Sequence, residues 1–131
     1  MPGERILVVE DNEANLRLVT YLLEAKGYEI RGAGDAQQAL LMVESFRPRM
    51  ILMDLQLPGI DGYELTRRLK SNPATREVVI IALTAFAMRG DEDKARAAGC
   101  DGYITKPIDT RALPGKIAEL LAASAPSNGA A

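Results

Sequence analysis

Short apolar runs alternate with longer amphipathic segments along almost the whole chain, and this alternation restricts the fold more than any other feature. We predict five strands, at residues 6–9, 28–31, 50–53, 78–83 and 102–104. The segment Met50-Ile51-Leu52-Met53 is continuously apolar, which is typical of a parallel strand covered on both faces. Helical periodicity fills the gaps between the strands, so the pattern predicts five βα units.

The predicted helices carry start signals and one irregularity. Asp35 is followed three residues later by Gln38, and Asp61 by Glu64, which is the spacing of a capping box at a helix N-terminus. Pro114-Gly115 falls early in the last helical segment, and a proline in a helix interior costs about 3 kcal/mol. We therefore expect that helix to start late or to have an irregular first turn.

Five βα units with right-handed crossovers form a doubly wound α/β domain, in which helices cover both faces of a five-stranded parallel sheet. For five strands we predict the flavodoxin-like order 2-1-3-4-5. The length of 131 residues is that of one domain. We assign residues 1–123 to this domain and expect the small, polar segment 124–131 to be a disordered tail.

The composition excludes several classes of site and partner. The chain has no histidine, which removes His-based zinc sites, Ser-His triads and phosphohistidine chemistry, and its one cysteine cannot form an intrachain disulfide. A net charge of -2 offers no basic field to a nucleic-acid backbone. We find no secretory signal and no apolar run long enough to span a bilayer. We therefore expect a cytoplasmic protein that binds neither nucleic acid nor membrane.

Polar residues follow four of the five predicted strands. Glu10-Asp11 follows the first strand and Asp54 the third, while Thr84 follows the fourth and Lys106 the fifth. Each alone has an ordinary explanation, since an Asp after a strand is often a helix N-cap and a lysine is usually solvated. Because ligand sites form at the carboxyl ends of parallel strands, where the strand order reverses, their concentration at one edge predicts a shared site.

Three carboxylates at one edge repel each other unless a cation lies among them. Oxygen ligands without His or Cys favour Mg²⁺, or Mn²⁺ in its place, over zinc. Asp54 ends the central strand and precedes a loop that contains Pro58 and Gly59, so we assign it as the nucleophile. Glu10-Asp11 and Asp54 are the candidate metal ligands, together with the backbone carbonyl of Gln56. A carboxylate, a divalent cation, an ammonium group and a hydroxyl favour phosphoryl transfer through an aspartyl phosphate.

The motifs that carry these residues resemble the receiver domain of bacterial response regulators. They are Glu10-Asp11-Asn12, the segment MDLQLPGIDG at 53–62, Leu83-Thr84-Ala85 and Lys106-Pro107. The resemblance covers about residues 4–123. Over residues 85–101 the sequence is similar to stand-alone receivers of the DivK type and to receivers fused to hybrid histidine kinases.

The resemblance implies a role for each site residue. Glu10 and Asp11 correspond to the family's Mg²⁺-binding acidic pair, and Asp54 corresponds to its phosphorylated aspartate. Thr84 and Lys106 correspond to its hydroxyl and lysine. Tyr103 corresponds to its switch aromatic, and Lys106-Pro107 to its cis peptide bond.

The resemblance also implies a single-domain signalling protein of a two-component or phosphorelay pathway rather than an enzyme. Such a protein supports its own phosphorylation and slow autodephosphorylation. Because the chain has no histidine, its phosphoryl donor must be a phosphohistidine on a histidine kinase or a histidine phosphotransfer protein. The output is then contact with a downstream protein effector or kinase, by a monomer or a weak dimer.

Other classes of protein share parts of this pattern. Phosphatases of the haloacid dehalogenase class also combine an Asp nucleophile, Mg²⁺, a hydroxyl and a lysine. They typically carry a second carboxylate two residues after the nucleophile, where this chain has Gln56. A flavodoxin-like cofactor carrier needs a hydroxyl-rich phosphate loop after the first strand, where Asp11-Asn12-Glu13 would repel phosphate. The phosphatase is the alternative to the receiver.

Overall fold

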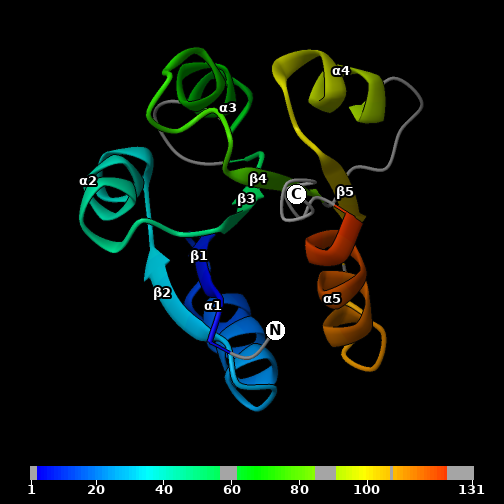
Figure 1. The fold of residues 1–131 in the computed structure, drawn as a ribbon. Coiled ribbons are helices and arrows are strands. Elements are labelled where there is room, and N and C mark those ends of the chain that lie inside the picture. The colour runs from blue at the N-terminus through cyan, green and yellow to red at the C-terminus, as the bar shows by residue number, and fades with distance from the viewer. Residues whose placement is uncertain (1–2, 57–61, 85–90, 107, 124–131) are drawn as a thin grey trace.

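Five strands and five helices alternate along the part of the chain that the computed structural model describes, which is residues 3–56, 62–84, 91–106 and 108–123 (Figure 1). The strands are β1 (Arg5–Val9), β2 (Glu29–Ala33), β3 (Met50–Asp54), β4 (Val79–Thr84) and β5 (Gly102–Thr105). The helices are α1 (Glu13–Glu24), α2 (Ala36–Phe46), α3 (Gly62–Ser71), α4 (Asp91–Ala98) and α5 (Leu113–Ala123).

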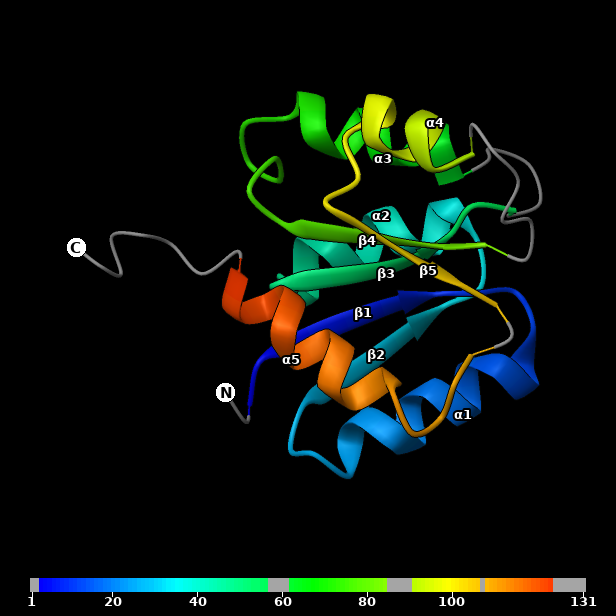
Figure 2. The same ribbon diagram turned by 90° about the vertical axis from the view of Figure 1, so that its right-hand side faces the viewer.

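The strands form one parallel sheet in the order β2-β1-β3-β4-β5. Helices α1 and α5 cover one face, and α2, α3 and α4 cover the other (Figures 1 and 2). The predicted doubly wound α/β fold and its strand order are therefore confirmed. None of the described helices is long and apolar enough to cross a membrane.

The sheet is buried on both faces, and its central strands are apolar up to their last residues, Asp54 and Thr84. Every residue of β3 and of β4 is buried. Alternate side chains enter different cores: Leu52 packs against the cluster formed with α1 and α5, while Ile51 and Met53 pack against the cluster under α2, α3 and α4. This two-sided burial explains why these strands read as continuous apolar runs rather than as alternating ones.

The first two helices begin at side-chain caps. Asn12 caps α1 by accepting the Asn15 N–H at 3.0 Å, and Asp35 caps α2 by accepting the Gln38 N–H at 2.8 Å. The Gln38 side chain accepts a hydrogen bond from Gly34 N–H, at 2.9 Å, rather than from the N–H of the cap residue Asp35. The capping box at Asp35 is confirmed with this shift, whereas the one predicted at Asp61 lies outside the described residues.

The strand boundaries differ from the predicted ones by one or two residues, most of all at the end of β2. Strand β2 covers Glu29–Ala33 instead of 28–31, because its pairing with β1 continues until Ala33 meets Val9 at the end of that strand. Helix α5 begins at Leu113, so Pro114 lies in its first turn, where the missing N–H has no helical acceptor to lose. The helix starts late, as predicted, and avoids the cost of an interior proline. The predicted tail at 124–131 lies outside the described residues.

Candidate functional site

The predicted site residues stand at the carboxyl ends of four neighbouring strands. All strands run the same way, so these ends share one edge of the sheet (Figure 2). Asp54 is the last residue of β3 and Thr84 the last of β4, while Glu10 follows β1 and Lys106 follows β5. The Lys106 N–H donates to the Thr84 carbonyl at 2.7 Å, which continues the β4–β5 pairing up to the lysine.

Three carboxylates meet at this edge. One oxygen from each of Glu10, Asp11 and Asp54 lies within 4.8 Å of the others. Glu10 is 2% exposed and Asp54 is 3% exposed, whereas Asp11 is exposed to solvent. Buried carboxylates this close repel each other strongly unless a cation lies among them.

Lys106 supplies one cation. Its Nζ lies 2.8 Å from Glu10 Oε1 and 3.3 Å from Asp54 Oδ2, and its side chain is 14% exposed. Burial opposes the charge of this ammonium, but the two carboxylates outweigh burial and raise the pKa of Lys106. Burial also raises the pKa of Glu10, which Lys106 opposes and Asp54 reinforces.

The donor set of the site fits a hard divalent cation. One ammonium group faces three carboxylates, so negative charge remains in excess. Glu10 Oε1 is buried, and its ion pair with the Lys106 ammonium at 2.8 Å occupies one of its two lone pairs. An all-oxygen set with a lone pair left open is the type of site that suits Mg²⁺ or Mn²⁺.

Main-chain N–H groups orient two of the carboxylates. Asn12 donates to Glu10 Oε2 at 3.2 Å, and Gln56 donates to Asp54 Oδ1 at 2.9 Å. Each bond spans two residues and folds the chain back on the side chain just after its strand. In each case the second oxygen of the carboxylate, Glu10 Oε1 or Asp54 Oδ2, is the one nearer Lys106.

The remaining predicted site residues have different surroundings. Thr84 is 3% exposed at the end of β4. Tyr103 is half-buried on β5 opposite Ala82 and packs against the cluster under α2, α3 and α4. Gln56 is exposed next to the carboxylates. Pro107, and with it the predicted cis peptide bond, lies outside the described residues.

Sequence reasoning missed one residue in contact with the site. A Cβ atom on Gly62 would lie 2.6 Å from the Asp54 carbonyl oxygen and 2.7 Å from Leu55 Cα. The sequence signal was a glycine at a predicted helix start, and it does not reveal which main chain lies against it.

Comparison with known proteins identifies the family. Residues 6–118 match the sequence profile of the response regulator receiver domain. The polar-differentiation response regulator DivK of Brucella anthropi is 47% identical over 103 residues, which cover 79% of this chain and 84% of that protein.

Solved structures agree with this match. The receiver domain of a sensor histidine kinase from Pseudomonas aeruginosa, which holds a magnesium ion in its active-site cleft, is 37% identical with a TM-score of 0.82 and covers 92% of this chain and 98% of that one. The Mn²⁺-bound form of response regulator Rcp1 is 26% identical with a TM-score of 0.76 and covers 92% and 93%. This chain therefore belongs to the family of response regulator receiver domains, the signalling modules of two-component systems.

Proposed function

We propose that this chain accepts a phosphoryl group from a phosphohistidine of a partner protein onto Asp54. In this proposal residues 1–123 are the receiver domain, and the partner is a histidine kinase or a histidine phosphotransfer protein. The observation that carries the proposal is the cluster of three carboxylates at the carboxyl end of the sheet, two of them buried, faced by the ammonium of Lys106. The family match supports the reaction class.

The residues that would hold Mg²⁺, or Mn²⁺ in its place, are Glu10, Asp11 and Asp54 with the carbonyl of Gln56. The open lone pair on Glu10 and the excess negative charge support this assignment. The metal-bound relatives support it as well. When bound, the cation neutralises the carboxylates and draws charge from the phosphoryl oxygens.

Asp54 supplies the nucleophile. A carboxylate oxygen forms a new bond to phosphorus while the phosphorus–nitrogen bond of the phosphohistidine breaks, and the nitrogen keeps that electron pair. Gln56 N–H already binds Oδ1 of Asp54, which leaves Oδ2, on the side of Lys106, as the attacking atom. Because the pKa of Lys106 is raised, its ammonium stays charged at neutral pH and stabilises the charge on the transferred group.

The signal leaves the site through the strand ends beside Asp54. Asp54 lies opposite Leu83 in the β3–β4 pairing, so the next residue of β4, Thr84, lies beside the end of β3, where it would meet a phosphoryl group on Asp54. We assign the Thr84 hydroxyl as a donor to that group and Tyr103, on the neighbouring strand, as the side chain that moves in response. The output is a changed contact surface for a downstream protein effector or kinase.

The phosphoacceptor is tested by exposing the protein to acetyl phosphate with Mg²⁺ and measuring intact mass. We expect one phosphoryl group per chain, lost with EDTA and lost in Asp54→Asn. Asp35→Asn is the matched control, because Asn also caps helices well and Asp35 lies away from the site. Undiminished labelling of Asp54→Asn would refute the assignment, and sustained hydrolysis of p-nitrophenyl phosphate would favour the phosphatase alternative.

The output step is tested with Thr84→Ala. This variant is expected to take up phosphate on Asp54 but to lose the change in amide exchange over residues 84–106 that beryllofluoride, a phosphoryl mimic, induces in the wild type. An unaltered exchange response in the variant would remove Thr84 from the mechanism and leave the phosphorylation site intact.

A further inference from the structure

We propose that Gly62 and Thr66, in the first turn and a half of α3, are positioning residues that hold the main chain of Asp54 for phosphoryl transfer. The inference rests on the proposed function of Asp54. Neither residue touches the reacting atoms; each acts through the main chain that carries the nucleophile.

Gly62 allows α3 to approach the site more closely than any other residue would. A Cβ atom here would lie 2.6 Å from the Asp54 carbonyl oxygen and 2.7 Å from Leu55 Cα, and both are main-chain atoms that cannot rotate away. The Gly62 N–H also donates to the Leu55 carbonyl at 3.2 Å. The first residue of α3 is therefore in direct contact with the end of β3.

Backbone conformation does not explain this glycine. Gly62 is the first residue of α3, a position with helical backbone that any residue can adopt. What requires glycine at this position is the space beside Asp54, not the turn.

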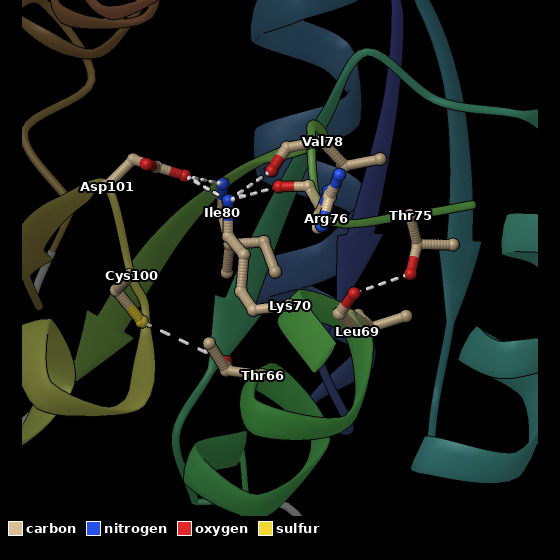
Figure 3. A network of polar contacts seen from close by, with 9 residues as sticks. All are labelled: Thr66, Leu69, Lys70, Thr75, Arg76, Val78, Ile80, Cys100 and Asp101. Atoms are coloured by element: carbon tan, nitrogen blue, oxygen red, sulfur yellow. Dashed lines mark hydrogen bonds and ion pairs between the residues drawn. The ribbon is translucent and has the colours of Figure 1, made fainter. Parts of the chain in front are cut away.

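Thr66 fixes the position of Gly62 in this contact. Its side chain is fully buried, and its hydroxyl donates to the Gly62 carbonyl at 2.7 Å. The Cys100 thiol lies 3.9 Å from the same hydroxyl, on the turn that precedes β5 (Figure 3). A buried hydroxyl is retained at a net cost unless its hydrogen bonds are made, and here both bonds anchor the first turn of α3.

Two contacts, one from β4 and one from α3, hold the main chain at Asp54 and Leu55 from both sides. The Leu55 N–H donates to the Leu83 carbonyl at 3.0 Å, which attaches this segment to β4, while Gly62 presses on it from α3. Only the Cβ atom of Asp54 separates its carboxylate from this main chain, so a shift of the main chain moves the nucleophile. Misplacement of a reacting group by about 1 Å can cost about 100-fold in rate.

The decisive experiment compares phosphorylation rates of Gly62→Ala and wild type with acetyl phosphate at saturating Mg²⁺, at a temperature where circular dichroism shows both proteins folded. We expect the maximal rate constant to fall about 10- to 100-fold, with little change in the donor concentration that gives half-maximal rate. Gly115→Ala is the matched control, because it also adds a methyl group in a helix but meets nothing within 4 Å.

Thr66 is tested by a pair of variants, which also decides the question if Gly62→Ala does not fold. Thr66→Val removes the hydroxyl and keeps the shape, so its rate is expected to fall, by less than in Gly62→Ala. Thr66→Ser restores the hydroxyl and is expected to restore the rate. A purely structural role would lower the unfolding midpoint of Thr66→Val and leave the rate of the folded protein unchanged.

The outcomes separate this inference from the function beneath it. If wild type is labelled and Gly62→Ala is labelled at the same rate, the role of Gly62 is refuted while Asp54 remains the phosphoacceptor. Equal rates for Thr66→Val and Thr66→Ser refute the role of Thr66. If wild type is not labelled at all, the proposed function fails and this inference fails with it.

Discussion

Two lysines that are mostly buried lie at opposite ends of the sheet, and their partners differ in kind. Lys70, at the end of α3, is 20% exposed and lies beside the starts of β4 and β5. Lys106 is 14% exposed and lies beyond the far end of β5. Both ammonium groups are largely removed from water, so the protein must provide the hydrogen-bond acceptors and negative charge that water would otherwise supply.

At Lys70 the acceptors and the negative charge balance the ammonium group. Its Nζ donates to the carbonyls of Arg76 at 3.1 Å and Val78 at 2.7 Å and to Asp101 Oδ2 at 2.8 Å (Figure 3). The same Asp101 oxygen also accepts the Ile80 N–H at 2.9 Å. One cation and one carboxylate balance, every ammonium proton has an acceptor, and the cluster ties three segments together.

At Lys106 the negative charge of the carboxylates exceeds the positive charge of the ammonium group. One ammonium group faces the carboxylates of Glu10 and Asp54, and Asp11 adds a third within 4.8 Å of both. The difference between the two ends is informative: a balanced cluster holds the fold together, whereas a cluster with excess negative charge would be stabilised by a further cation.

The largest effect on stability is expected for Lys70→Met. The substitution keeps the side-chain length but removes the cation beside Asp101 and the ammonium donor to two carbonyls, so the free energy of unfolding should fall by about 2 kcal/mol in urea titrations. Phosphorylation of the folded variant should match wild type. Lys94→Met, at an exposed lysine on α4, is the control and should change stability by less than about 0.5 kcal/mol. Loss of phosphorylation in folded Lys70→Met would contradict the division between the two ends.

Mg²⁺ is expected to stabilise the wild type by about 1.4 kcal/mol at ten times its dissociation constant, because it binds the folded state and not the unfolded one. Lys70→Met should gain the same increment, since it leaves the three carboxylates intact. Asp11→Ala should gain clearly less. Thermal unfolding with and without Mg²⁺ measures all three, and equal increments in wild type and Asp11→Ala would show that these carboxylates are not the metal site.

The smallest expected effect compares one chemical change at both ends. Without Mg²⁺, Asp54→Asn should raise the free energy of unfolding by about 1 kcal/mol, because it removes repulsion from a cluster with excess negative charge. Asp101→Asn should instead lower it, because Lys70 loses its only carboxylate among the described residues. The measurement is urea unfolding in EDTA, and a shift in the same direction for both variants would refute the contrast.

The fold and much of the site could be predicted because they depend on local signals. The central strands have apolar side chains at every position before their final residues, Asp54 and Thr84, and a strand covered on both faces needs that pattern. Strand β2 was misplaced by the same reasoning, because at the edge of the sheet its extent is decided by pairing with β1 rather than by its own residues. The hydrogen bond that Gly34 N–H donates to Gln38 Oε1 likewise depends on the local path of the chain, which the sequence spacing does not specify.

By itself, the sequence determined the alternation of strands and helices and the placement of an acidic or hydroxyl residue, or the lysine, after four of the strands. Both are properties of segments a few residues long. Only the tertiary structure decided that Glu10 is buried while its neighbour Asp11 is exposed, and that Gly62 lies against the main chain of Asp54. Burial and contact depend on which strand pairs with which, which hydrogen bonding between distant segments sets, and on which helix covers each face, which follows from the right-handed crossovers and the strand order.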